Sequence, residues 1–396
     1  MTIASNHSEQ RAPDQTLAAR ALADLISTPS VNPGIYEAAI AQRVARWFDG
    51  TPAEIDFVDT LLPGRPSVAV TIKGSGGGPR LVLNGHLDTV PVDDEQRWTV
   101  DPFAATIRDG YMYGRGASDM KAGLAVQIAV AHTLLQRSQK VKGDLVLHFA
   151  AGEESGEPGT LGLVQAGHVG DFGVVTEPTQ LEVSVATRGL MMVHIRINGR
   201  SIHASRAEAG LNPVAKLSKV LDAVFGYRTK VLETQHPLLG SGSCTPTVVK
   251  GGVKQNAVAD YCDLYLDRRL VPGETVAAEL EKLRGFLEQV RREDPEFDYE
   301  LDHLPYPFEP AEIPTDAGLA LQLQRVAGRV LGTPPPIIGT PFSCDVRNLV
   351  NDAGMEAVTF GPGDVAECHC VDERVSLSQL NDAVEVLTEL STEILG

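Results

Sequence analysis

No stretch of this 396-residue sequence reaches the roughly 18 consecutive apolar residues that a membrane-spanning helix requires. The first residues, MTIASNHSEQRAPDQ, lack the order of basic and then apolar residues that marks a secretory signal, so we expect a loose polar tail there. Cysteine is scarce as well. The chain has five, an odd number scattered over a long sequence, which is unlike a disulfide framework. These absences favour a reducing, cytoplasmic compartment.

Basic residues are also in short supply. Lysine and arginine total 34 against 52 aspartates and glutamates, which gives a formal net charge of −18. Such an acidic surface argues against nucleic acid and anionic membranes as partners, although it does not identify a substrate. The rest of the composition, 43% hydrophobic and 22% charged, is ordinary for a globular enzyme.

The length exceeds that of one ordinary core, because single cores stop growing at about 250–300 residues, so we expect two domains. Strand-like and helix-like segments alternate along the first part of the chain. This alternation predicts an α/β fold, a mostly parallel sheet with helices on both faces and functional sites at the carboxyl ends of the strands. The expected strands are 67–72, 80–83, 144–151 and 173–175, and the expected helices are 17–26, 38–48 and 123–136.

The pattern changes near Val183. From there to about residue 304 the order is strand, helix, strand, strand, helix, strand, which is that of an α+β ferredoxin-like sandwich. After about Pro310 helices and strands alternate again. We therefore predict a larger domain formed by residues 1–184 and 306–396, with a smaller domain of residues 185–305 inserted into it.

Histidine and carboxylate residues follow the predicted strands. The stretch GHLDTV places His86 at the end of one strand and Asp88 two residues later. An imidazole in this position can bind a metal ion, and the aspartate can fix its tautomer. Taken alone, the pair is more typical of a histidine beside a turn, because histidine has many structural roles.

Two further motifs carry carboxylates. In GRGASDMKAG, Asp119 lies between a glycine-rich turn and a helix, and alone it favours an ordinary helix N-cap. In AGEESG, Glu153 and Glu154 end an apolar strand. Two adjacent buried carboxylates need a cation, so one could bind a metal while the other acts as a general base toward water. The alternative is a solvated loop, where most such pairs are found.

Two more candidate ligands complete the set. Glu177, in VVTEPT, follows another predicted strand, and His369 lies in ECHCVDERV near the C-terminus. Two histidines with three or four carboxylates suit a pair of borderline metal ions such as zinc. Each motif is weak alone, but their order and spacing together are specific.

With these motifs the chain resembles the co-catalytic zinc amidohydrolases, which include acetylornithine deacetylase, succinyl-diaminopimelate desuccinylase, aminoacylase and carboxypeptidase G. The resemblance runs from about Ala18 to the C-terminus. It rests on GHLDTVPV, GRGASDMKAG, AAGEESG, VVTEPT, GRSIHAS and DRRLVPGE, which stand in the family's order. It implies that residues 1–184 and 306–396 form a di-zinc catalytic domain and that residues 185–305 form a lid and dimerisation domain.

The resemblance also implies a ligand set. His86 would bind one zinc ion and His369 the other, and Asp119 would bridge the two ions. Glu154 would complete one of the two sites and Glu177 the other.

The remaining roles follow from the same resemblance. Asp88 would orient the histidine two residues before it, and Glu153 would be the general base and then the acid that protonates the leaving nitrogen. His203, in GRSIHAS, would reach across a dimer to stabilise the tetrahedral oxyanion. Asn256 and Arg269 would hold a substrate carboxylate, for which the planar arginine fork is well suited. A surface ion pair for Arg269 and a turn role for His203 are the alternatives.

Some positions depart from the family's pattern. Cys368 and Cys370 flank His369 and could add soft donors or become oxidised. Alternate residues of an extended segment point to opposite faces, which favours small packing residues instead. Arg188 replaces a common lysine, and Phe342 stands where smaller residues are frequent. These departures leave the preference for the acyl group and the side chain open.

The combined expectation is hydrolysis of the amide bond of a small N-acylated amino acid or a related compound. The cofactors would be two Zn²⁺ ions, for which Co²⁺ or Mn²⁺ can substitute, and the enzyme would be a homodimer joined through the lid domain. A di- or tripeptidase and an N-carbamoyl amide hydrolase are alternatives with the same chemistry. A non-catalytic dimeric binding protein is a third, but it would have lost a ligand or the general base, and none is missing.

Overall fold

The computed structural model describes residues 13–137 and 140–396, so most of the expected N-terminal tail lies outside the described residues. The chain divides into two compact units. The first runs to Val185 and continues with Ile313–Ile338 and Cys344–Gly396, and the second comprises Ala186–Glu312 and Gly339–Ser343. The second unit extends beyond residue 305, because Phe308 still pairs with the strand that opens it.

Most strands of a nine-stranded sheet belong to the first unit, whereas β13 is assigned to the second. The strand order is β1-β2-β6-β3-β7-β15-β8-β13, with β14 paired to β8. Strands β6, β3, β7 and β15 are parallel, whereas the ladders at both ends are antiparallel. The sheet is therefore mixed, and the prediction of a mostly parallel sheet holds for its centre. The strands are β1 (Glu54–Val58), β2 (Ser67–Ile72), β3 (Arg80–His86), β6 (Asp144–Ala150), β7 (Phe172–Val175), β8 (Val183–Thr187), β13 (Ala311–Glu312), β14 (Ile337–Thr340) and β15 (Glu356–Thr359).

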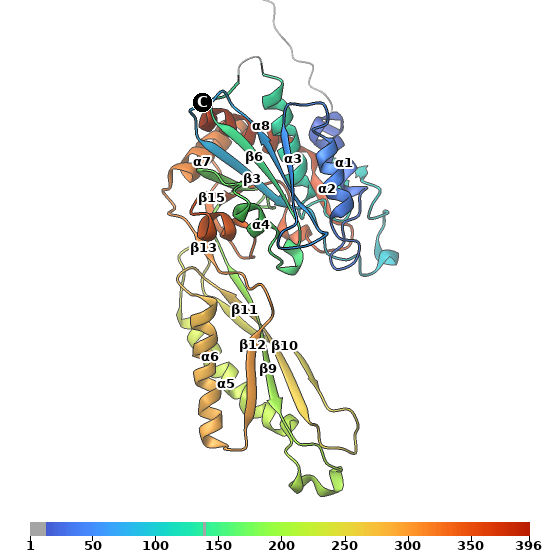
Figure 1. The fold of residues 1–396 in the computed structure, drawn as a ribbon, viewed down its shortest axis with the longest axis vertical. Coiled ribbons are helices and arrows are strands. Elements are labelled where there is room, and N and C mark those ends of the chain that lie inside the picture. Colours follow the sequence, from blue (N-terminus) through green and yellow to red (C-terminus); the bar gives the residue numbers. More distant parts are fainter. Residues whose placement is uncertain (1–12, 138–139) are drawn as a thin grey trace, which may run out of the picture. The chain divides into compact units, whose positions relative to one another are not determined.

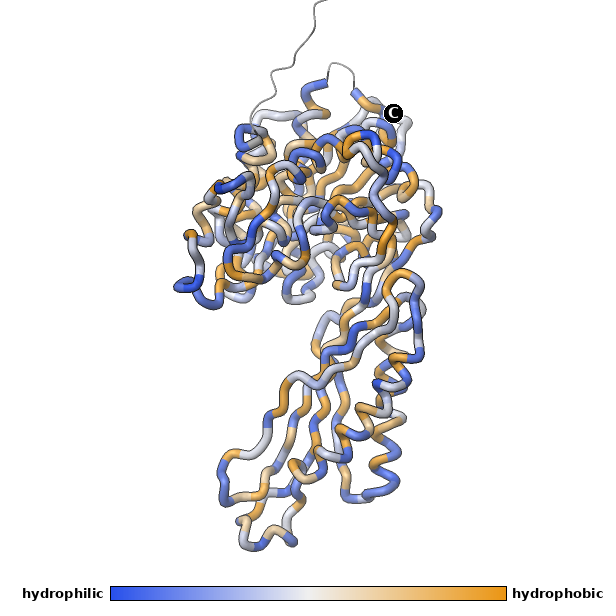
Figure 2. The backbone as a smooth tube through the Cα atoms, turned by 180° about the vertical axis from the view of Figure 1, so that it is seen from behind, coloured by the Kyte–Doolittle hydropathy of each residue, from blue (hydrophilic) through white to orange (hydrophobic). Residues whose placement is uncertain are grey.

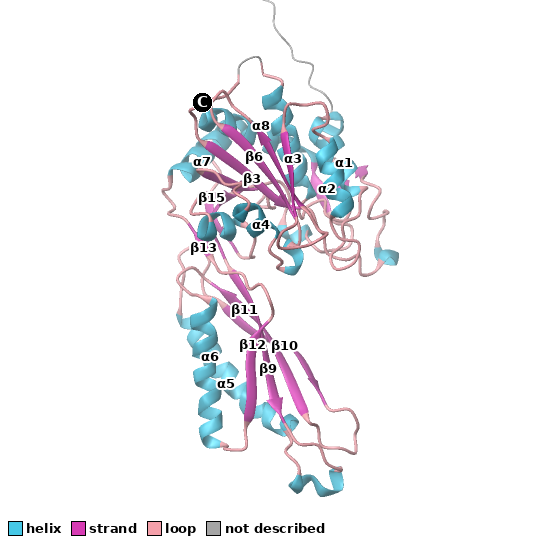
Figure 3. Cartoon of the chain, in the orientation of Figure 1, coloured by secondary structure: helices cyan, strands magenta, loops and turns pink. Residues whose placement is uncertain are grey.

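Helices cover both faces of this sheet (Figures 1 and 3). A Cβ atom added to Gly85 of β3 would lie 2.8 Å from Leu124 of α3. The side chain of Asn84, the preceding residue, donates a hydrogen bond to Thr160 of α4. Successive residues of a strand point to opposite faces, so α3 and α4 lie on opposite sides of β3. The helices are α1 (Leu17–Ile26), α2 (Ala38–Arg46), α3 (Lys121–Leu135), α4 (Gly159–Gln165), α7 (Gly318–Leu331) and α8 (Leu377–Leu395).

Side-chain caps and apolar faces explain where the terminal helices begin. The Thr16 side chain accepts a hydrogen bond from the N–H of Ala19 at the start of α1, and Ser376 caps α8 in the same way. Helices α1, α3 and α8 pack against one another.

A separate three-stranded sheet joins β4 (Thr106–Arg108), β5 (Tyr111–Tyr113) and β16 (Arg374–Ser376), and none of these short strands was predicted.

The second unit has the element order of the predicted ferredoxin-like sandwich: β9 (Gly189–Asn198), α5 (Pro213–Glu233), β10 (Ser243–Gly251), β11 (Tyr261–Leu270), α6 (Val276–Glu293) and β12 (Asp298–His303). Its four strands form one antiparallel sheet in the order β10-β11-β9-β12, and α5 packs against α6. Buried and less buried positions alternate along β9, and from Val193 to Asn198 hydrophobic and polar side chains alternate as well. Orange and blue stretches follow one another along the strands of this unit in Figure 2. The buried set forms a core with the two helices.

Among the described residues, no helix is both long and apolar enough to cross a membrane.

Candidate metal centre

Three of the predicted ligands and the predicted general base lie where the parallel strands end. His86 is the last residue of β3, and Glu153 and Glu154 occupy a short 3-10 turn directly after β6. Glu177 follows β7. Strand β3 pairs with both neighbours, His86 opposite Ala150 of β6 and Asn84 opposite Val175 of β7. The register therefore brings three separate segments to one edge of the sheet.

Two histidines share one aspartate at this edge. His86 Nε2 lies 3.0 Å from Oδ1 of Asp119 and 3.5 Å from Oε1 of Glu177. His369 Nε2 lies 3.3 Å from Oδ2 of the same aspartate and 3.1 Å from Oε2 of Glu154. The two oxygens of Asp119 thus face two different imidazoles, and each imidazole has a further glutamate of its own.

The carboxylates of the cluster are crowded and desolvated. Burial raises the pKa of Glu153 and Glu177 well above the usual range, and nearby carboxylates raise both further. Burial and the charge of Asp119 raise the pKa of Glu154 to about 7. Burial alone would lower the pKa of His86, but the surrounding carboxylates raise it well above its usual value. So much negative charge in one buried place calls for cations.

The cluster fits metal ions on independent grounds. Oε1 of Glu154 is buried and has no hydrogen-bond partner within the described part of the chain. The ligand atoms of His86, Glu153 and Glu177 lie close enough to hold one ion, as do those of His86, Asp119 and Glu154. Imidazole and carboxylate donors together suit borderline divalent ions. The centre therefore has the donor atoms and the charge for two such ions.

Asp88 does more than orient one ring. The His86 Nδ1 hydrogen bond, 2.9 Å long, goes to the backbone oxygen of Asp88, and the nearer carboxylate oxygen is 3.5 Å away. The Asp88 carboxylate instead accepts the backbone N–H groups of Gly152, Glu153 and Glu154, each at 3.1 Å. One aspartate therefore holds both the metal-side histidine and the turn that carries the two glutamates.

Further charged residues surround this turn, and no local pattern of the sequence indicated them. Asn32 donates to Oδ2 of Asp88 at 2.9 Å and to Glu157 at 3.2 Å. Arg65 contacts both oxygens of Glu157 and, on its other side, both oxygens of the buried Glu37. Alternating charges in a partly buried chain of this kind favour a fixed geometry for the turn.

Asp345 is a further buried carboxylate near the centre. Its side chain accepts a 2.6 Å hydrogen bond from Thr160 and lies 3.5 Å from Arg347. Its charge contributes to the raised pKa of Glu153.

Three predicted site residues lie in the second unit. His203 Nδ1 accepts the N–H of Ser205, so its Nε2 carries the ring proton in the neutral form. Backbone bonds place His203 next to the segment of Asn256, whose oxygen accepts the N–H of Ala204. Arg269 forms a two-bond ion pair with Asp267, at 2.9 and 3.1 Å.

The two cysteines beside His369 bond to backbone oxygens. The Sγ of Cys368 contacts the Asp364 oxygen at 3.4 Å, and the Sγ of Cys370 contacts the Glu367 oxygen at 2.9 Å. Neither thiol belongs to a possible ligand group among the described residues. All five cysteines are free.

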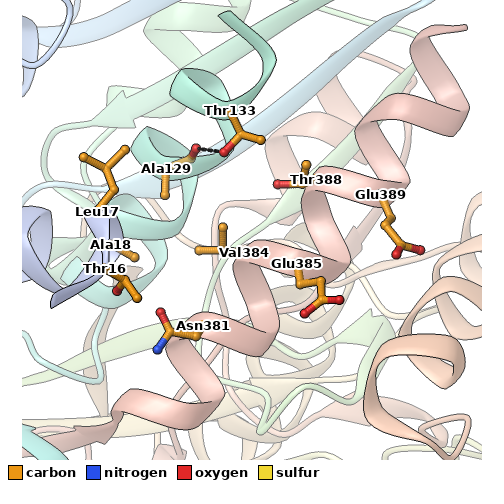
Figure 4. A pocket seen from close by; sticks show the side chains of 10 residues that line it. All are labelled: Thr16, Leu17, Ala18, Ala129, Thr133, Asn381, Val384, Glu385, Thr388 and Glu389. Carbon is orange, nitrogen blue, oxygen red and sulfur yellow. Dashed lines mark hydrogen bonds between the residues drawn. The ribbon is translucent and has the colours of Figure 1, made fainter. Parts of the chain in front are cut away.

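A pocket of about 400 Å³ lies away from this centre, between α1, α3 and α8 (Figure 4). Leu17, Ala129 and Val384 give it an apolar wall, with Glu385 and Glu389 beside it. Its lining contains neither histidine nor cysteine, so it lacks the imidazole donors of the strand-end cluster.

Comparison with known proteins identifies the class. Residues 82–393 match the model of Peptidase family M20/M25/M40, and because this match spans most of the chain, the protein belongs to that family. The chain is 28% identical over 380 residues to N-formyl-4-amino-5-aminomethyl-2-methylpyrimidine deformylase of Bacillus subtilis, covering 88% of each chain. It is 28% identical over 382 residues to acetylornithine deacetylase of Photorhabdus laumondii, covering 92% and 94%.

Solved structures share the fold. The M20 metallo-carboxypeptidase Sso-CP2 of Sulfolobus solfataricus aligns with a TM-score of 0.79 at 19% identity, over 96% of this chain and 99% of that one. The YXEP protein of Bacillus subtilis, described as a dinuclear metal-binding M20 peptidase, aligns with a TM-score of 0.70 at 18% identity, covering 96% and 97%. These structures show the fold. The family match and the two deacylating relatives identify the chain as a metal-dependent amide hydrolase of this family.

Proposed function

We propose that this enzyme removes the acyl group from a small N-acylated amino acid or a related compound, using two zinc ions. The observation that carries the proposal is the shared aspartate. Asp119 presents one oxygen to His86 and the other to His369. We assign Glu177 to the His86 ion and Glu154 to the His369 ion, from the distances of 3.5 and 3.1 Å. Cobalt or manganese can take the place of zinc in such a donor set.

When bound, the ions would polarise the acyl oxygen and lower the pKa of the attacking water toward about 7. Glu153 takes the proton from this water, whose oxygen attacks the acyl carbon. The carbon–nitrogen bond then breaks, and Glu153 returns the proton to the leaving nitrogen. The products are a carboxylic acid and a free amine.

The second unit completes this proposal. The N–H of His203 Nε2 would donate a hydrogen bond to the oxyanion, and such a donor is typically worth about 10²–10³ in rate. Asn256 and Arg269 would bind a substrate carboxylate, which would take over the place of Asp267 on the guanidinium. We include a homodimer formed through this unit, in which His203 serves the partner's centre, and a cytoplasmic location without nucleic-acid or membrane partners.

A substrate panel tests the chemistry. N-formyl, N-acetyl, N-succinyl and N-carbamoyl amino acids and aminomethylpyrimidines are compared with di- and tripeptides, with zinc or cobalt added. We expect turnover of an acylated amine, loss of activity after chelation, and recovery with metal. Preferred cleavage of peptides would favour the peptidase alternative. Full activity of a verified metal-free preparation would contradict the metal assignment, and binding without turnover would favour the non-catalytic alternative.

Two neighbouring glutamates test the division of labour. Glu153→Ala should lose nearly all turnover, since a general base contributes roughly 10²–10⁴ in rate, yet should keep both metal ions. Glu154→Ala should lose the metal near His369. Glu153→Asp is the control, because it keeps the charge but withdraws it by about one ångström and should retain a trace of activity. Metal analysis and single-turnover rates distinguish the general base from the metal ligand. If Glu153→Ala lost a metal ion and Glu154→Ala did not, the two roles would have to be exchanged.

A further inference from the structure

Glu373 is a buried carboxylate just outside the metal cluster, with 1% of its surface exposed. Its Oε1 accepts the backbone N–H groups of Ser118 at 2.9 Å and Asp119 at 3.0 Å. Its Oε2 accepts the N–H of Gly116 at 3.1 Å and Nη1 of the buried Arg115 at 2.7 Å. The carboxylate therefore receives four donors, one of them charged.

These donors define what Glu373 does. Burying a carboxylate is costly unless hydrogen bonds and an opposite charge compensate it, and here both are present. Because both oxygens are directed at the turn that precedes α3, they are not aimed at the metal cluster. Glu373 is thus an anchor for the turn that carries Asp119, rather than a ligand.

The same residue belongs to the segment that carries His369. The backbone oxygen of Glu373 accepts the N–H of Gly114 at 2.9 Å. Nearby, the Ser118 hydroxyl donates to the backbone oxygen of Asp364 at 3.1 Å. Two segments some 250 residues apart in sequence are therefore joined along their length, and Glu373 makes most of the side-chain contacts.

The His369 segment needs such an anchor. It has little regular structure of its own between the 3-10 turn at Val365–Glu367 and β16. His369 and Asp372 both have left-handed backbone angles, with φ of 59° and 58°, which persist in non-glycine residues only where the surroundings fix them. The His369 side chain is 53% exposed, so packing alone does not hold it.

We propose that Glu373 is a positioning residue that ties the Asp119 turn to the His369 segment, so that the metal ion near His369 is bound tightly only while this tie is intact. The inference rests on the proposed assignment of metal ligands. Residues that orient metal ligands from behind typically change metal affinity by about 10–100-fold when they are removed. We expect an effect of this size for the ion near His369 and a smaller one for the ion near His86.

Stepwise zinc titration of the metal-free full chain, in competition with a chromophoric chelator, tests the proposal. Glu373→Gln keeps the shape of the side chain but turns an NH₂ group toward two donors. It should therefore weaken the binding of the ion near His369 about 10–100-fold. Glu373→Asp keeps the charge and serves if the glutamine variant does not fold. Glu274→Gln, at another buried glutamate paired with an arginine at 2.7 Å, is the matched control and should bind both ions normally.

A second background separates positioning from general stability. In His369→Ala the ion near this position has already lost its histidine ligand. Adding Glu373→Gln should therefore lower the zinc affinity of that site little further, because the effects of two substitutions that act through one another are not additive. The proposal would be overturned if Glu373→Gln weakened the binding of both ions equally and did so just as much in the His369→Ala variant. Wild-type zinc affinities in Glu373→Gln would also overturn it. If the wild-type chain itself bound fewer than two ions, the proposed metal assignment would fail first.

Discussion

Replacing Asp88 by asparagine tests how Glu153, the proposed general base, is held in place. The Asp88 carboxylate accepts three backbone N–H groups of residues 152–154 and the side-chain amide of Asn32. Asparagine can satisfy one side of this arrangement, but its NH₂ group then faces the donors on the other side. Each oxygen holds two donors, so either orientation loses two hydrogen bonds to a charged group.

The magnitude follows from these contacts. A hydrogen bond to a charged group contributes about 1.5–3 kcal/mol, so the loss is roughly 3–6 kcal/mol. This is a large part of the roughly 5–15 kcal/mol that stabilises a typical domain. Glu153 should also shift, and about one ångström of displacement can lower kcat about 10²-fold. His86 bonds to the backbone oxygen, which the substitution retains, so the ion at His86 should remain.

The assay combines urea unfolding, metal analysis and steady-state kinetics. Asp263→Asn in the second unit is the control, because it weakens an ion pair with Arg196 at 2.8 Å without touching the centre. We expect Asp88→Asn, but not Asp263→Asn, to lower kcat. KM and the bound metal should change little in Asp88→Asn. Unchanged stability and kcat, or a loss of activity that follows metal loss in proportion, would refute the reasoning.

Three further predictions concern stability and assembly. Burial lowers the pKa of His148 to about 3, so between about pH 6.5 and pH 3 only the unfolded state takes up its proton. The free energy of unfolding should therefore decrease as the pH falls through this range, by up to about 1.4 kcal/mol per pH unit. Urea unfolding of metal-free His148→Gln should lack this component. Gly123→Ala would place a methyl group against a backbone oxygen and should cost at least about 1–3 kcal/mol, whereas Gly285→Ala, in open space on α6, should stabilise by up to about 1 kcal/mol in thermal unfolding. Mixed dimers of inactive His203→Ala and Glu153→Ala chains should regain part of the activity, and proven heterodimers without activity would count against a shared site.

Much of the fold was predictable, because periodicity and caps are local signals. The expected helix 17–26 has the bounds of α1, and the expected strand 67–72 has those of β2. The small sheet of β4, β5 and β16 was missed. Its strands have three residues each, and β5 pairs with β16, at the other end of the chain, which no local pattern can show.

Some residues of the candidate site could likewise be predicted from the local sequence, and others could not. His86 and the two glutamates were visible because polar residues stood directly after apolar strands. Glu373 and Arg65 were not, because their role depends on partners far away in sequence, and a lone charged residue in a loop is ordinary. The sequence thus pointed to the proposed metal ligands, and only the folded chain shows what keeps them in place.

The order of strands has a consequence for synthesis. β15 lies between β7 and β8 in the large sheet, yet it follows the entire second unit in sequence. While the chain emerges from the ribosome, the large sheet is interrupted at its middle, whereas the four strands of the second unit are already consecutive and can close. The unit in the middle of the chain can therefore be the first to finish folding, and an unfinished sheet edge stays exposed until the last part of the chain appears.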